Sequence, residues 1–195
     1  MTEISYMGEI CSLLSAIFWA LAIIIFKKIG DRVSPIIINP IKNTIGLLLF
    51  LLTFIIMGIP LLPNPQFSNT DLLLLSISGM IGIGIADIIF LHSLNILGAG
   101  ISAIVDTVYS PFVILFAFII LGEHLSSTQF LGGIFIIASV IYASTKIQNI
   151  PVDRKLFKKG VLYAVGSIAM MALGIVMIKP ILNTVRDNIS LQLWI

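Results

Sequence analysis

The chain has 195 residues, of which 58% are hydrophobic and 10% are charged, and its formal net charge at pH 7 is +2. Soluble domains carry about 25% charged residues, so this composition excludes an ordinary soluble protein and indicates a polytopic membrane protein. The basic residues gather beside the apolar segments and form no stripe, so we expect no nucleic-acid partner. The single cysteine, Cys11, excludes a disulfide or a cysteine-based metal cluster within one chain.

Residues 7–26 form the first apolar segment and are long enough to cross a bilayer. The residues before this span include Glu3 but no lysine or arginine, so we expect the span to be retained rather than removed as a signal peptide. Small and polar side chains recur along it every three or four residues, which predicts a stripe that faces protein instead of lipid. The stripe consists of Ser12, Ser15, Ala16 and Trp19.

The second predicted span covers residues 36–59 and carries Lys42 near its start. We expect the Lys42 side chain to extend to the membrane interface, as lysines near helix ends do. The proline-rich residues 60–69 predict a loop.

The third and fourth spans, residues 71–94 and 100–121, form a helical hairpin whose turn lies at residues 97–99. Asp87 and Asp106 are each about ten residues from that turn, or roughly 15 Å at 1.5 Å per residue. This is about half of a hydrocarbon core roughly 30 Å thick, so we expect both acids near the middle of the membrane. A carboxylate at that depth is costly, and function is the default hypothesis.

The fourth span places polar side chains on one helical face, namely Ser102, Asp106, Tyr109 and Ser110, and these are followed by Pro111. A proline inside a transmembrane helix predicts a kink. No lysine or arginine occurs between Asn43 and Thr145, so the acids of that stretch must be neutral, hydrated or paired with a group elsewhere.

Two further spans follow, residues 127–145 and 160–182, and the charged residues 149–159 between them predict a domain boundary. A shift of 152 residues aligns the sixth span with the first and gives seven identities in 22 columns. Five spans separate the copies, and because five is odd the second copy enters from the opposite face, as in an inverted repeat. The identical pairs are Gly8 and Gly160, Ser15 and Ser167, Ala20 and Ala172, Leu21 and Leu173, Ile23 and Ile175, Lys27 and Lys179, and Ile29 and Ile181.

A wider set of residues matches a known family in type and spacing, most specifically between Ser93 and Gly133. The set comprises Gly8, Ser15, Ala16, Trp19, Ala20, Lys27, Ser93, Leu94, Gly98, Ala99, Ser102, Ala103, Ile104, Pro111, Ala117, Leu121, Gly122, Glu123, Leu125, Gln129 and Gly133. On these residues the chain resembles the EamA-type transporters of the drug/metabolite transporter superfamily.

The resemblance implies an all-α fold of two inverted five-helix repeats around a central cavity, in a multi-pass protein of the cell membrane. It implies gradient-driven movement, most often outward, of small metabolites, amino acids or drugs, without a cofactor. Residues 1–148 would be the first repeat, 149–159 a charged linker and 160–195 the start of a second, truncated repeat. The expected partners are the lipid bilayer, a small-molecule substrate and the missing second repeat.

Six residues are the candidates for the substrate or proton pathway, and no catalytic or metal-binding residue is expected. Asp87 and Asp106 are the acids that would bind a proton or the substrate, with packing or hydrogen bonding of a neutral acid as the alternative. Trp19 and Tyr109 would stack on an apolar or cationic substrate, or pack within the protein. Ser15 and Ser102 complete the set.

Two other functions compete with transport. Two acids in mid-membrane are compatible with a membrane-embedded enzyme such as an intramembrane aspartyl protease. That chemistry comes with Tyr-Asp and Gly-x-Gly-Asp, whereas Asp106 follows Val105 and Asp87 follows Ala86, so we expect no enzyme. A non-transporting assembly subunit is the third hypothesis.

Two indications of the orientation of the chain in the membrane disagree. Nine of the eleven basic residues lie on the side reached after spans one and five, which places the N-terminus outside by the positive-inside rule. The resemblance implies an N-terminus inside.

Overall fold

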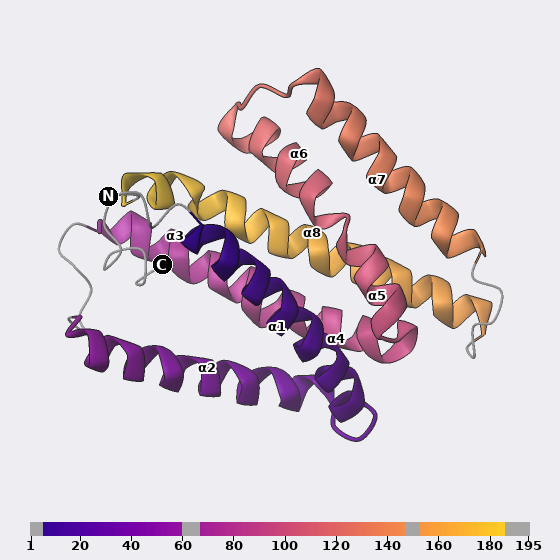
Figure 1. Cartoon of the computed structure of the whole chain (residues 1–195), viewed down its shortest axis with the longest axis horizontal. Coiled ribbons are helices and arrows are strands. Elements are labelled where there is room, and N and C mark those ends of the chain that lie inside the picture. Colours follow the sequence, from indigo (N-terminus) through magenta and orange to yellow (C-terminus); the bar gives the residue numbers. More distant parts are fainter. Residues whose placement is uncertain (1–5, 60–66, 147–152, 186–195) are drawn as a thin grey trace.

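The structure is a computed structural model that describes residues 6–59, 67–146 and 153–185, and every regular element in these ranges is a helix. The helices follow one another as predicted for a polytopic membrane protein (Figure 1). They are α1 (Met7–Gly30), α2 (Pro35–Met57), α3 (Asn69–Gly79), the π-helix η1 (Met80–Ile85), α4 (Ala86–Leu97), α5 (Ala99–Asp106), α6 (Tyr109–Leu121), α7 (Ser127–Lys146) and α8 (Arg154–Thr184).

Within the described residues, five helical segments are long and apolar enough to cross a membrane. They are α1, α2, the continuous run from α3 to α4, the pair α5 and α6, and α8. Helix α7, which was predicted as a sixth span, has a shorter apolar stretch, Ser127–Ala143. The prediction of an all-helical, polytopic membrane fold is confirmed.

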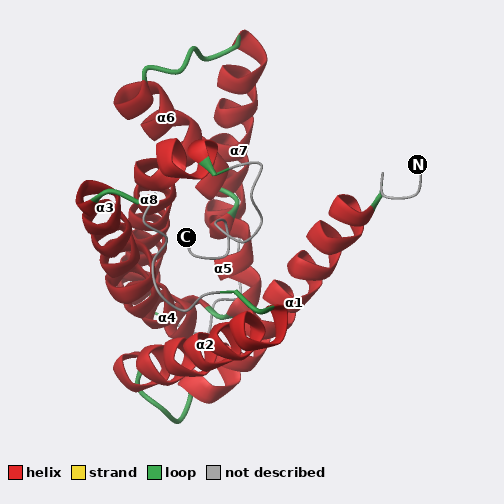
Figure 2. Ribbon diagram, turned by 90° about the vertical axis from the view of Figure 1, so that its left-hand side faces the viewer, coloured by secondary structure: helices red, strands yellow, loops and turns green. Residues whose placement is uncertain are grey.

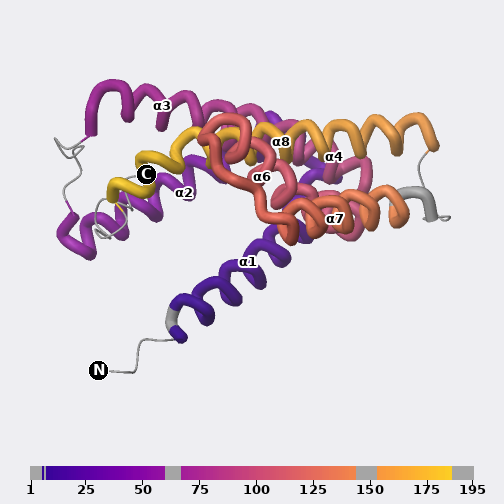
Figure 3. The backbone as a smooth tube through the Cα atoms, turned by 90° about the horizontal axis from the view of Figure 1, so that it is seen from above, coloured from indigo at the N-terminus to yellow at the C-terminus, as the bar shows by residue number. Residues whose placement is uncertain are grey.

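Helix α8 is the centre of the bundle: it lies along α3, η1 and α4 and also packs against α5 and α6 (Figures 1 and 3). Its contact with the third span is held by two hydrogen bonds to glycine carbonyls. Ser93 Oγ donates to Gly160 O at 3.0 Å, and Ser78 Oγ donates to Gly174 O at 2.9 Å. A Cβ atom on Gly160 would lie 2.8 Å from Ile96 Cγ2, so a glycine is needed for this close approach.

Helix α1 is attached to the bundle at its C-terminal end and projects away from it at its N-terminal end (Figures 2 and 3). Ile23 is buried, and Asn95 Nδ2 of α4 donates to Gly30 O at 3.1 Å. The predicted protein-facing stripe lies on the projecting part, where Ser12, Ser15 and Ala16 are exposed. Within the described residues, Trp19 of this stripe contacts protein by its hydrogen bond to Asp106 of α5, whereas Ser12, Ser15 and Ala16 do not meet the prediction.

The hairpin turn lies where the sequence predicts it. Gly98 joins α4 to α5 there, and its positive φ of 79° favours glycine at this position. The two spans of the hairpin are not continuous α-helices, however. The third contains the π-helix η1, and the fourth breaks between Asp106 and Tyr109. The break lies four residues before Pro111, whose ring has no N–H to bond the Thr107 carbonyl and crowds it. The sequence predicts a kink in this span from Pro111, and the helix is interrupted just before that proline.

Candidate functional site

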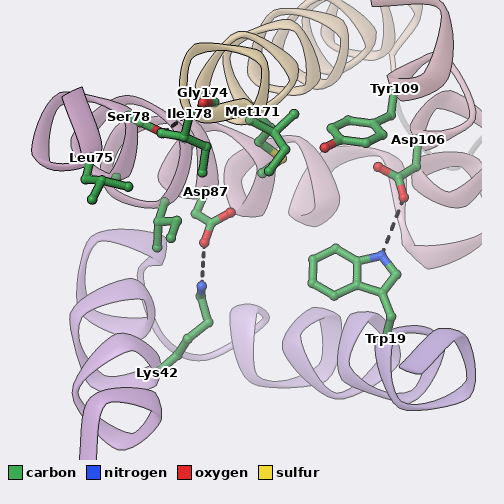
Figure 4. Close-up of a pocket in the computed structure, with 14 residues that line it drawn as sticks. Trp19, Lys42, Leu75, Ser78, Asp87, Asp106, Tyr109, Met171, Gly174 and Ile178 are labelled. Carbon is green, nitrogen blue, oxygen red and sulfur yellow. Dashed lines mark hydrogen bonds and ion pairs between the residues drawn. The ribbon is translucent and has the colours of Figure 1, made fainter. Parts of the chain in front are cut away.

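A cavity of about 550 Å³ opens between α8 and the helices that precede it (Figure 4). It contains both aspartates of the hairpin, together with apolar side chains and three glycines. The lining residues are Trp19, Lys42, Leu75, Ser78, Gly79, Gly82, Ile83, Asp87, Asp106, Tyr109, Met171, Gly174, Ile175 and Ile178. Of the six predicted pathway residues, the structure brings four together here: Trp19, Asp87, Asp106 and Tyr109.

Asp87 is the second residue of α4, immediately beyond η1, and its side chain is 15% exposed. Its Oδ2 atom forms an ion pair with Lys42 Nζ of α2 (Figure 4). Lys42 Nζ also donates to Asn43 Oδ1 at 3.0 Å. The prediction that Lys42 extends to the membrane interface was wrong, because the buried carboxylate attracts the ammonium group into the bundle.

Asn39, one turn before Lys42, connects α2 to the π-helix. Its side chain is buried, and its Nδ2 atom donates to Ile83 O at 3.1 Å and to Gly84 O at 2.9 Å. A π-turn interrupts the ordinary i→i−4 hydrogen-bond pattern of a helix, and the Asn39 amide binds the carbonyl groups of that turn. Asn39, Lys42 and Asn43 form one polar face of α2, since residues three and four apart are neighbours on a helix.

Asn39 and Lys42 were not predicted from the sequence as members of the site. A signal was present: three polar residues, Asn39, Lys42 and Asn43, recur at helical spacing in an otherwise apolar span. Lys42 is also the last basic residue before a long stretch with four acids and no lysine or arginine. The contribution of α8, through Met171, Gly174 and its neighbours, had no comparable signal because it depends on tertiary packing.

Asp106 is the last residue of α5 and Tyr109 is the first residue of α6, so the break between these helices places both side chains at one end of the cavity. Asp106 Oδ2 accepts a hydrogen bond from Trp19 Nε1 of α1 at 3.4 Å (Figure 4). Among the described side chains, no lysine or arginine forms an ion pair with Asp106. The two carboxylates therefore differ, since Asp87 has a cationic partner and Asp106 has a neutral one.

The structure does not bring Ser15 and Ser102 to the cavity. Ser15 is exposed on the projecting part of α1. Ser102 is fully buried in α5, and its Oγ atom has no hydrogen-bond partner among the described residues. Ser102 lies one turn before Asp106 in the same helix, but it is covered by the bundle while Asp106 lines the cavity, so the predicted common polar face does not extend to Ser102.

A second interhelical ion pair lies away from the cavity. Lys179 Nζ of α8 contacts Glu123 at the end of α6, with distances of 2.6 Å to Oε1 and 2.8 Å to Oε2. Lys27, the residue of α1 that aligns with Lys179 in the predicted repeat, pairs with Asp31 four residues further on. No group of three or more His, Cys, Asp or Glu side chains in the described ranges could hold a metal ion.

The helices and the acid-lined cavity define a polytopic membrane protein with an internal polar site. The EamA-like transporter family model matches residues 6–145 of the chain. The chain therefore belongs to the EamA-like transporter family.

A protein named as an uncharacterized transporter from Methanothermobacter thermautotrophicus (strain Delta H) is 27% identical over 143 residues, which is 71% of this chain and 39% of the relative. The chain thus spans well under half the length of this relative. No solved structure matches the chain.

Proposed function

We propose that the protein moves small molecules across the cell membrane by alternating access, and that its substrates are metabolites, amino acids or drugs that it exports. The observation that supports this most is that Asp87 and Asp106, 19 positions apart in the sequence, line one cavity with Trp19 and Tyr109. Carboxylates inside transmembrane segments mark proton and substrate pathways.

The two acids have separate roles in this proposal. Asp87 is held by Lys42, so a proton or a substrate group that reaches Asp87 must compete with a tethered ammonium group. Asp106 faces the aromatic end of the cavity and is bonded to an indole N–H. A charged group that loses its partner in a low-dielectric site is strongly destabilised, so a change of partner at either acid can favour a different arrangement of the helices.

We propose further that residues 1–148 form a first repeat, that residues 149–159 link it to a second, and that a second, inverted repeat completes the pathway. The greater length of the relative supports this, as does the alignment of the first span with the sixth at a shift of 152 residues. Helix α8 would be the first helix of that second repeat, and its buried stripe against α4 is then an interface between repeats.

The aspartyl-protease hypothesis gains no support from the geometry. Such a site needs two carboxylates that share a proton, whereas Asp87 is paired with Lys42. An assembly subunit without transport is distinguishable by experiment, because it requires no solute flux.

Flux through proteoliposomes that contain the chain together with the proposed second repeat tests the proposal. Solute panels of amines, amino acids and organic acids would be measured with and without a proton gradient. We expect flux of at least one class, and we expect the combined Asp87→Asn and Asp106→Asn variant to lose it. Asp31→Asn is the matched control, since Asp31 is exposed and pairs with Lys27 outside the cavity. Equal flux in the double variant and the native chain would rule out the role of the acids.

A further inference from the structure

The charges of the cavity do not balance. Among the residues that the structure describes, its lining includes one cationic side chain, Lys42, and two carboxylates, Asp87 and Asp106, so that with all three ionised these residues carry a net charge of +1 − 2 = −1. Lys42 is already engaged by Asp87 and by the amide oxygen of Asn43. The excess negative charge therefore resides on Asp106, whose partner is the neutral indole of Trp19.

An ionised carboxylate in an apolar setting requires a compensating cation or a proton. The hydrogen bond from Trp19 Nε1 is long, at 3.4 Å, and supplies no charge. The acceptor capacity of the carboxylate exceeds this one bond, since an ionised aspartate offers about four lone-pair sites. The Asp106 end of the cavity can thus accept an additional donor that carries positive charge.

The side chains around Asp106 specify the kind of cation. Trp19 approaches from α1 and Tyr109 from α6, on opposite sides of the carboxylate (Figure 4). Aromatic rings beside an acidic group are the recurrent means by which proteins bind organic ammonium groups, and tryptophan is the most effective ring. A strongly hydrated metal ion would need several oxygen ligands, which this end of the cavity does not offer.

The rest of the cavity provides room for an apolar body. Met171, Ile175 and Ile178 of α8 line it, with Gly82 opposite. A volume of about 550 Å³ lies within the 300 to 1,000 Å³ that is common for small-ligand sites. Methionine adapts its shape to varied apolar groups, so the body can vary while the charged group stays fixed.

We propose that this cavity binds a monovalent organic ammonium ion, with its charged nitrogen against Asp106 between Trp19 and Tyr109 and its apolar body against α8. An anionic ligand is disfavoured because it would have to separate Lys42 from Asp87. The inference deepens the proposed function, since it names the substrate class of the same cavity. Binding can be measured without transport, so the two proposals fail separately.

Trp19 itself reports on binding. The chain has two tryptophans, Trp19 and Trp194, and Trp194→Phe leaves Trp19 as the sole indole fluorophore. Phenethylammonium would be titrated into the purified chain in detergent. We expect a saturable change in Trp19 emission, because the ligand places a positive charge beside the indole that bonds Asp106. The isosteric neutral probe 2-phenylethanol and the anion phenylacetate should give no saturable change.

Variants locate the site. Asp106→Asn should weaken phenethylammonium binding by about tenfold or more, because a charge-assisted contact becomes a neutral one. Asp106→Glu, which keeps the charge, should restore part of the affinity, and Asp31→Asn should leave it unchanged. Equilibrium dialysis of the amine gives the same comparison without relying on fluorescence.

Three results would overturn the inference: an equal response to 2-phenylethanol, tighter binding of phenylacetate than of the amine, or unchanged affinity in Asp106→Asn. The probe series on the Trp194→Phe protein decides the question even where Asp106→Asn does not fold. Saturable amine binding without any solute flux would support this site and contradict the transport proposal.

Discussion

Lys42 and Asp87 form an ion pair between α2 and α4, inside segments that are otherwise apolar. Their side chains are 26% and 15% exposed, so each group has lost most of its contact with solvent or lipid. If either group were removed, the other would lose its oppositely charged partner, although Lys42 would keep its hydrogen bond to Asn43. The pair therefore fixes the position of α2 against the third span as well as the charge of the cavity.

Lys42→Met should lower the free energy of unfolding in detergent by about 3 kcal/mol, the lower end for a buried pair that is partly exposed, because it leaves the Asp87 carboxylate without its cation while keeping the volume of the side chain. Denaturant or SDS titration followed by circular dichroism measures the change. The double variant Lys42→Met with Asp87→Asn should lose less than the sum of the two single variants, since neither member then remains unpaired. Additive losses would show that the two residues do not interact.

Ser102 differs from the Lys42–Asp87 pair because it is a fully buried polar side chain without a hydrogen-bond partner among the described residues. An unsatisfied buried hydroxyl costs about 1 to 3 kcal/mol. Ser102→Ala should therefore be neutral or stabilising in the same titration. A loss of more than about 1 kcal/mol would mean that the hydroxyl has a bonding partner in the membrane-embedded protein.

The π-helix η1 is the element that sets the direction of Asp87. A π-turn shifts all residues beyond it around the helix axis, and Asp87 follows η1 by two positions. The turn is supported from α2 by the Asn39 amide, which donates to Ile83 O and Gly84 O. An ordinary α-helix over the same residues would present a different face of α4 to Lys42.

Asn39→Ala should increase amide hydrogen exchange over residues 83–88 and lower the free energy of unfolding by about 1 to 3 kcal/mol, because two carbonyl groups lose their donor. Mass spectrometry of the exchanged peptides measures the local effect. Thr53→Ala on the same helix is the matched control, since the Thr53 hydroxyl donates to Leu49 O within α2. Unchanged exchange over residues 83–88 in Asn39→Ala would mean that η1 does not depend on this amide.

The bundle as a whole depends on the close approach of α8 to α4, which Gly160 permits. A Cβ atom there would lie 2.8 Å from Ile96 Cγ2 and 2.9 Å from Leu97 Cδ2. Gly166 is exposed on the same helix, and a Cβ atom added to it would meet no neighbouring atom within 4 Å among the described residues. These two glycines separate the effect of packing from that of helix propensity.

Gly160→Leu should lower the free energy of unfolding by about 1 to 3 kcal/mol more than Gly166→Leu does, because overpacking forces α8 away from α4. Both changes replace the same residue type in one helix, so the difference reports the interhelical contact. The chemical unfolding assay used for Lys42→Met measures it. Equal stability of the two variants would contradict the placement of α8.

The sequence predicts the fold class and the family well, because long apolar segments and the residues from Ser93 to Gly133 are local features. It also predicts four of the residues that line the cavity, since an intramembrane acid or aromatic side chain stands out on composition alone. It does not predict Lys42 pairing with Asp87 or the support of η1 by Asn39. Those contacts depend on how neighbouring helices rotate about their axes, which hydropathy does not specify.

The exclusion of Ser15 and Ser102 from the cavity has the same origin. For Ser102, helical spacing places it one turn before Asp106 in α5, but it does not specify which neighbouring helices cover each part of that face. For Ser15, the argument assumed a partner along the length of α1, whereas the described bundle contacts this helix near its C-terminal end. Which neighbouring helices cover each part of a helix is decided by packing in the folded molecule, and the pattern of residues along one helix does not specify it.

Solvent access to the cavity shows whether Asp87 and Asp106 line one common cavity within the membrane protein. Ile83 and Ile85 are 56% and 50% exposed and lie two positions apart, but of the two only Ile83 is a lining residue. In a Cys11→Ser background reconstituted in lipid vesicles, Ile83→Cys and Ile85→Cys would be treated with a charged, membrane-impermeant thiol reagent. If the two acids line one solvent-accessible cavity, Ile83→Cys is labelled rapidly and Ile85→Cys is labelled little. Equal labelling of both positions, or labelling of Ile85→Cys alone, would contradict a common cavity.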